Sequence, residues 1–156
     1  MQLRVAAVGQ RMPGWVKEAW TEYARRMPPS LQLSLREIGL AKRSKNADVK
    51  RLTASESNAL YEAMPARGTI IALDIKGQGW STGKLATRLE QWMGEGRDVG
   101  FMIGGPEGID ARVMQKANER WSLGPLTLPH PLVRVVLAEQ LDRAWTITQN
   151  HPYHRA

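Results

Sequence analysis

Hydrophobic and polar residues follow one another in blocks that switch between the spacing of strands and the spacing of helices. Short apolar or alternating runs predict strands at residues 3–8, 31–38, 69–74, 99–103 and 123–128. Helical spacing predicts helices between them, at residues 15–26, 48–64, 82–93, 110–121 and 131–148. Strands that alternate with helices in this way are typical of α/β proteins with a mainly parallel sheet.

The last predicted helix is apolar around most of its circumference. Val133, Leu137 and Ala144 fall near helical spacing, and Leu132 and Trp145 extend the apolar character beyond a single stripe. A helix of this kind is usually buried on several sides. Its partner is either the rest of its own domain or a second subunit, and the pattern alone does not choose between them.

Composition points to one domain spanning residues 1–156, because a chain of this length with 42% hydrophobic residues builds one sizeable core. No apolar run reaches the roughly 20 residues that cross a bilayer, so no membrane partner is expected. Zero cysteines exclude a disulfide scaffold and a thiolate metal site. The N-terminus lacks a signal-peptide pattern, and a cytoplasmic protein is the simplest interpretation.

Positive charge is concentrated in the first third of the chain. Residues 1–51 hold 11 Lys and Arg against 4 Asp and Glu, which accounts for the whole net charge of +7. The charge is densest around Lys42, Arg43 and Lys45. Such a segment favours phosphate groups and predicts an RNA-binding surface at these three residues. The alternative is an ordinary solvated loop.

Several familiar catalytic motifs are missing from the sequence. It has no Walker A sequence, no HExxH and no nucleophile elbow. The turn after the first predicted strand lacks the GxGxxG fingerprint of Rossmann folds. Three histidines occur without an acidic cluster, so we expect no metal site.

Two motifs in the second half of the chain stand out. Ile103-Gly104-Gly105-Pro106-Glu107-Gly108 directly follows a buried apolar run, and glycines there let the backbone approach a ligand closely. Residues 126–134 then enter the last helix, and the chain closes on Asn150-His151-Pro152-Tyr153-His154-Arg155. These motifs resemble the RlmH family of SPOUT methyltransferases. Further matches at residues 6–9, 12–15, 39–48 and 71–74 occur in the same order, so the resemblance covers the whole chain.

The resemblance implies a fold and an activity. The fold is a SPOUT-type, mainly parallel sheet with helices on both faces and a C-terminal trefoil knot. The activity is S-adenosylmethionine-dependent methylation of N3 of a pseudouridine in 23S ribosomal RNA, in helix 69 of the assembled ribosome. The family also implies a homodimer without a separate RNA-binding domain.

The resemblance places the cofactor at three segments of this chain. The residues that it implies are Leu73, Gly104, Gly105, Leu123, Gly124, Pro125, Leu126, Thr127 and Leu128. Ends of parallel strands are physically suitable for such a pocket. The alternatives are core packing for Leu73 and Leu126, and a simple tight turn for the glycines.

The C-terminal segment supplies candidates for the chemistry. An imide nitrogen becomes a better nucleophile when its proton is removed. The acceptor is a histidine, Tyr153 or a water, which spacing does not distinguish, and His154 and Tyr153 are the best candidates of the chain end. Arg134 is a candidate to hold a phosphate or the developing anionic base, and Arg155 is the alternative. The alternative for the last residues is a frayed chain end.

Two other functions remain open at this point. One is a non-catalytic ribosome-binding or assembly factor that retains the fold, which would explain the basic segment but leave the glycine motif without a role. The other is a SPOUT methyltransferase with a different RNA target.

Overall fold

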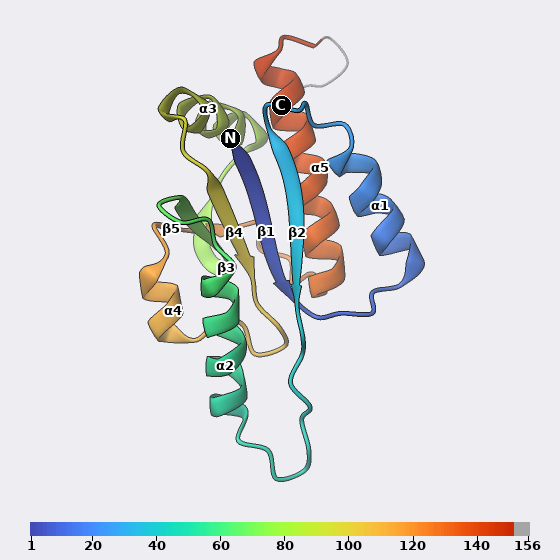
Figure 1. The fold of residues 1–156 in the computed structure, drawn as a ribbon, viewed down its shortest axis with the longest axis vertical. Helices are drawn as coiled ribbons and strands as arrows, with labels where there is room; N and C mark the ends of the chain where they lie inside the picture. The colour runs from blue at the N-terminus through green and yellow to red at the C-terminus, as the bar shows by residue number, and fades with distance from the viewer. Residues whose placement is uncertain (152–156) are drawn as a thin grey trace.

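A five-stranded sheet forms the centre of the computed structural model, which describes residues 1–151 (Figure 1). The strand order is β2-β1-β4-β3-β5, and every neighbouring pair is parallel. The strands are β1 (Gln2–Val8), β2 (Gln32–Ile38), β3 (Thr69–Gly79), β4 (Val99–Ile103) and β5 (Glu119–Ser122). The predicted α/β class with a parallel sheet is therefore confirmed.

Helices connect the strands and cover both faces of the sheet. They are α1 (Gly14–Ala24), α2 (Val49–Glu62), α3 (Thr82–Glu95), α4 (Ala111–Lys116) and α5 (His130–Thr148). Buried residues of α1, α3 and α5 join one hydrophobic cluster with the sheet, and those of α2 and α4 join a second cluster. The molecule thus has three layers, with the sheet in the middle.

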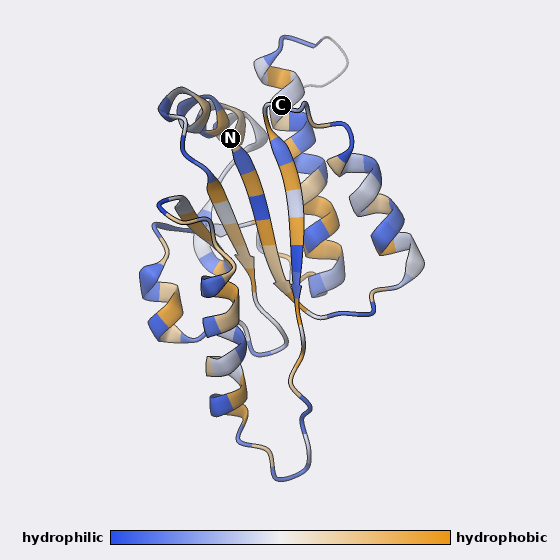
Figure 2. Cartoon of the chain, viewed as in Figure 1, coloured by the Kyte–Doolittle hydropathy of each residue, from blue (hydrophilic) through white to orange (hydrophobic). Residues whose placement is uncertain are grey.

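Strand alternation divides the two clusters. Leu3 and Val5 of β1 pair with Val99 and Phe101 of β4, and all four are fully buried under the α1, α3 and α5 layer. Ala6, the residue after Val5, belongs to the opposite cluster. Because successive side chains of a strand point to opposite faces, an apolar strand without alternation serves both layers at once. Figure 2 shows the hydrophobic positions, in orange, along the inner strands β1 and β4.

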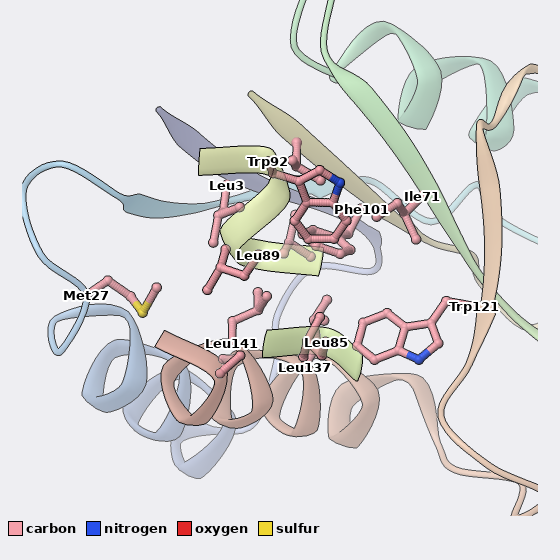
Figure 3. Close-up of a cluster of buried hydrophobic side chains, with 14 of the residues drawn as sticks. Leu3, Met27, Ile71, Leu85, Leu89, Trp92, Phe101, Trp121, Leu137 and Leu141 are labelled. Carbon is pink, nitrogen blue, oxygen red and sulfur yellow. The ribbon is translucent and has the colours of Figure 1, made fainter. Parts of the chain in front are cut away.

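The larger cluster is shown in Figure 3. Leu85 and Leu89 of α3 and Leu137 and Leu141 of α5 point into the same space as Phe101 of β4. All five side chains are fully buried. This packing fixes α5 against the sheet, and with it the loop that leads into α5.

The region between β4 and α5 corrects two predictions. The helix expected at residues 110–121 ends at Lys116, and the strand expected at 123–128 is instead β5, residues Glu119–Ser122. Asn118 explains the early helix end, because it exchanges hydrogen bonds with Ile70, donating its N–H to the Ile70 carbonyl and accepting the Ile70 N–H on Oδ1. Residues 119–122 then find ladder partners in β3, whereas Gly124 at φ +135° and Pro125 turn the following chain away.

β3 runs five residues beyond its predicted end at Asp74. Its ladder with β5 is interrupted between Leu73 and Gln78 and resumes at Gln78 with Trp121. An irregularity of this kind bends a strand and redirects its side chains. The interruption places Leu73 and Asp74 beside the loops that follow β4 and β5.

Candidate functional site

A cavity of about 790 Å³ lies where the chain leaves β4 and β5. Its walls are the interrupted part of β3, the loop 104–109 after β4, the loop 123–129 after β5 and the first turn of α5. Ligands of parallel α/β proteins typically bind at the carboxyl ends of the strands, and small-molecule pockets usually have 300–1,000 Å³. The cavity thus has the position and the size of a ligand site.

The cavity brings together almost all residues that the sequence predicted to bind the cofactor. Leu73, Gly104 and Gly105 lie in its wall, together with Leu123, Gly124, Leu126, Thr127 and Leu128. Pro125 is exposed and is not among the residues lining the cavity. Three segments far apart in sequence therefore meet at one place.

The loop after β4 is a tight turn that packing requires to contain glycine. Gly108 donates its N–H to the Gly105 carbonyl at 3.0 Å. A Cβ atom on Gly104 would lie 2.6 Å from the carbonyl carbon of Gly108, and one on Gly105 would lie 3.0 Å from Cγ1 of Val8. The glycines thus form the tight turn of the alternative interpretation, and this turn also lines the cavity.

The loop after β5 has a more open structure. The hydroxyl of Ser122 donates to the Gly124 carbonyl and accepts from the Gly124 N–H, both at 3.1 Å. Leu126 follows with 76% of its surface exposed, the largest exposed fraction among the big hydrophobic residues of the described range 1–151. An exposed leucine in a cavity wall is suited to covering an apolar part of a ligand.

Two buried side-chain atoms of the cavity-lining residues have no hydrogen-bond partner in the described structure. They are Nε1 of Trp121 and Nδ1 of His130, and both are buried. Burial, followed by the positive charge of Arg134, lowers the pKa of His130 below its ordinary value, so the imidazole is neutral near pH 7. His130 was not among the residues predicted for the site. Its position two residues beyond the predicted cofactor segment was the available signal.

Arg134 does not lie among the residues that line this cavity. It is 1% exposed, and its guanidinium donates to Oε2 of Glu37 at 2.8 Å and to the Gly9 carbonyl at 3.3 Å. A buried charge needs such partners. Arg134 is therefore held between β2 and the loop after β1, one turn along α5 from His130.

The predicted RNA-binding residues differ in their surroundings. Lys42 and Lys45 are exposed on the loop between β2 and α2, which projects at the lower end of Figure 1. The Arg43 side chain is only 20% exposed and forms salt bridges with Glu56 and Glu107. The clustered positive charge predicted one role for all three residues. In the fold, Arg43 is paired with two carboxylates, whereas Lys42 and Lys45 are exposed to solvent.

The remaining predictions concern the chain end and possible ligands. His154 and Tyr153 lie outside the described residues 1–151. Within that range no cluster of His, Asp and Glu could hold a metal ion. Over the same residues, none of the helices is long and apolar enough to cross a membrane.

Fold and site together define an α/β protein with a ligand cavity at the carboxyl ends of its parallel strands. The sequence model of a family described as "Predicted SPOUT methyltransferase" matches residues 1–154. The chain belongs to this SPOUT methyltransferase family.

Relatives of the same length carry one name. The protein called "Ribosomal RNA large subunit methyltransferase H" from Azotobacter vinelandii is 53% identical over 99% of this chain and 100% of its own length. Proteins of that name from Pseudomonas putida and Methylococcus capsulatus are 51% and 50% identical over the same shares.

A solved structure supports the fold. The structure of a probable methylase family protein from Haemophilus influenzae superposes with a TM-score of 0.57 at 11% identity. The superposition covers 99% of this chain and 70% of the other. At that identity the likeness concerns the fold alone. The SPOUT fold expected from the sequence is confirmed, while the trefoil knot stays a prediction.

Proposed function

We propose that this chain is an S-adenosylmethionine-dependent methyltransferase that modifies N3 of a pseudouridine in 23S ribosomal RNA, in helix 69 of the assembled ribosome. The observation that carries the proposal is the cavity, whose walls contain the segments that the family resemblance assigned to the cofactor. The name shared by relatives with 50–53% identity supports large-subunit ribosomal RNA as the substrate. A ribosomal substrate also supports a cytoplasmic location for the protein.

The residues of the cavity fit S-adenosylmethionine. Leu73, Leu126 and Leu128 offer apolar surface for an adenine ring, and the backbone of loop 123–128 offers hydrogen-bonding groups in the same wall. The unpaired Nε1 of Trp121 is a further donor beside the cavity. When bound, the cofactor supplies a methyl group on a positively charged sulfur, which needs no metal for its transfer.

The protein's own contribution is orientation, exclusion of water and removal of one proton. Gly104 and Gly105 fix a wall of the cavity that does not depend on side-chain conformation. For the proton at N3, His154 and Tyr153 of the chain end remain the proposed acceptors. Arg134 acts from behind the cavity wall in this proposal, by holding Gly9 and by adding its positive charge to the burial that lowers the pKa of His130.

A homodimer belongs to the same proposal. Several apolar residues of α5 are only partly buried by the chain itself, among them Val133, Trp145 and Ile147. A second subunit that covers α5 would bury these residues. The basic loop with Lys42 and Lys45 would remain free to contact RNA phosphates.

The experiment uses 50S and 70S ribosomes from a strain that lacks the endogenous methyltransferase. Purified protein with S-adenosylmethionine should add one methyl group to helix 69, located by mass mapping of the 23S RNA. Replacing Lys42 and Lys45 together with glutamine should weaken ribosome binding and reduce its salt dependence, because two phosphate contacts are lost. Cofactor affinity by calorimetry should stay the same in that variant.

Two results would contradict the proposal. Ribosome binding without cofactor binding would indicate a non-catalytic assembly factor. Cofactor binding with methylation of transfer RNA, and none of the ribosome, would indicate another RNA target.

A further inference from the structure

Arg43 is engaged on every side of its guanidinium. Nη1 donates to the Ala41 carbonyl at 2.8 Å and to Oε2 of Glu56 at 3.0 Å. Nη2 donates to Oε1 of Glu56 at 2.8 Å and to Oε2 of Glu107 at 2.5 Å, and Nε donates to Oε1 of Glu107 at 3.4 Å. The flat fork of an arginine thus clamps two carboxylates at once, an arrangement that lysine cannot reproduce.

Glu56 is the fixed end of this network. It lies on α2 with a side chain that is 6% exposed, and its Oε2 also accepts the N–H of Ala41 at 2.9 Å. Burial by itself raises the pKa of Glu56, but the hydrogen bonds from Arg43 and Ala41 outweigh it and leave the pKa below its ordinary value. The carboxylate is charged at neutral pH and requires Arg43 as its partner.

Glu107 is the end that reaches the cavity. It belongs to the turn 104–108, lies in the cavity wall and has a 35% exposed side chain. Arg43 is the salt-bridge partner that the described structure gives to it. On the same side of the turn, Leu40 lies 3.6 Å from the position of a Cβ on Gly105. The segment around residues 40–43 therefore supports the glycine turn from outside the cavity.

We propose that Arg43 is a positioning residue of the cofactor pocket, which holds the glycine turn against α2 through Glu107 and is not a phosphate contact. The inference rests on the proposed function, since it names the ligand of the cavity. It separates Arg43 from Lys42 and Lys45, whose exposed side chains form no salt bridge within residues 1–151. One basic segment then serves two purposes within four residues.

Calorimetry with S-adenosylhomocysteine tests the role. Glu107→Gln removes one charge at the exposed end, leaves Arg43 paired with Glu56, and should weaken binding about tenfold, as expected for the loss of one charge-assisted contact. Arg43→Gln should weaken binding by at least as much, and Arg43→Lys should restore part of the loss. The double variant Arg43→Gln/Glu107→Gln should bind no more weakly than Arg43→Gln alone, because both changes remove the same contact.

A second readout separates positioning from general stability. In ribosome methylation, Glu107→Gln should raise the KM for cofactor while kcat at saturating cofactor stays near the wild-type value, because bound cofactor restores the turn. The salt dependence of ribosome binding should be the same in Arg43→Gln as in the wild type. Arg51→Gln, an exposed arginine of the same basic segment, is the matched control and should leave cofactor affinity unchanged.

Two outcomes would overturn the inference in different ways. Wild-type affinity for S-adenosylhomocysteine in Glu107→Gln and Arg43→Gln, with a reduced salt slope in the latter, would make Arg43 a phosphate contact. A wild-type protein that binds no S-adenosylhomocysteine would overturn the proposed function itself, and the positioning role with it.

Discussion

The loop after β4 and the loop after β5 line the same cavity, yet they are held in opposite ways. Residues 104–108 form a turn packed against Val8 and tied by Glu107 to Arg43. Residues 123–129 are held by the contacts of Ser122 with Gly124 and leave Leu126 largely exposed. One wall is thus specified by interactions within the chain. The other presents apolar surface that only a ligand or a partner would cover.

The largest effect is expected from Gly104→Ala, a substitution in the tightly packed turn 104–108. Its Cβ would meet the backbone of Gly108, so the turn must open. Overpacking of this kind costs about 1–3 kcal/mol, and we expect a lower melting temperature together with the loss of measurable cofactor binding. Differential scanning fluorimetry and calorimetry measure the two effects.

Gly94→Ala is the control for this substitution, because a Cβ there meets nothing within 4 Å and the residue lies inside α3. It should be neutral or slightly stabilising. Full cofactor affinity in Gly104→Ala would show that the turn adapts easily, and the contrast between the two walls would disappear.

An intermediate effect is expected from Leu126→Ala, which alters the open wall. Because Leu126 is 76% exposed, its truncation should leave the melting temperature nearly unchanged. Cofactor affinity should fall by about 1–2 kcal/mol if the side chain becomes buried by the ligand. Val49→Ala, at a 42% exposed residue of α2, is the matched control and should change neither quantity. Lower stability without a change in affinity would place Leu126 in the core of the fold instead.

The smallest effect concerns pH. The pKa of His130 in the folded protein lies below its ordinary value near 6.5, because of burial first and of the Arg134 charge second. The unfolded chain therefore binds a proton more readily, so stability from the neutral imidazole is complete above about pH 6.5 and declines as the pH falls below it. Urea denaturation at a series of pH values should show this decline in the wild type and a weaker one in His130→Gln. Identical curves would mean that protonation of His130 is not linked to folding.

The sequence predicted the layers of the molecule well because strong apolar runs such as Val99–Ile103 are buried on both faces in any parallel sheet. It failed between residues 117 and 128, where an apolar run was taken for the strand. The true strand Glu119–Ser122 is polar at three of its four positions, and its ladder partners in β3 lie 43 to 48 positions earlier. Local pattern does not contain that information.

The site was predicted unevenly for a similar reason. Eight of the nine residues that the family resemblance assigned to the cofactor line the cavity, because glycine motifs and strand ends are visible in the sequence itself. Arg43 was assigned to RNA by its charge. Its partners Glu56 and Glu107 are 13 and 64 positions away, and only the fold brings them within hydrogen-bonding distance.

The position of β1 has a consequence for synthesis of the chain. β1 leaves the ribosome before both strands that it pairs with and becomes an inner strand, with Leu3 paired to Leu33 on one side and to Val99 on the other. β2 follows soon and protects one edge, but the other edge waits until β4 has been made. During that interval the nascent protein presents an open, apolar strand edge, the kind of surface that favours aggregation or chaperone binding. Parallel pairings over such sequence distances also slow folding. The strand order of the folded protein thus leaves this edge of β1 unpaired during synthesis until residues 99–103 have been made.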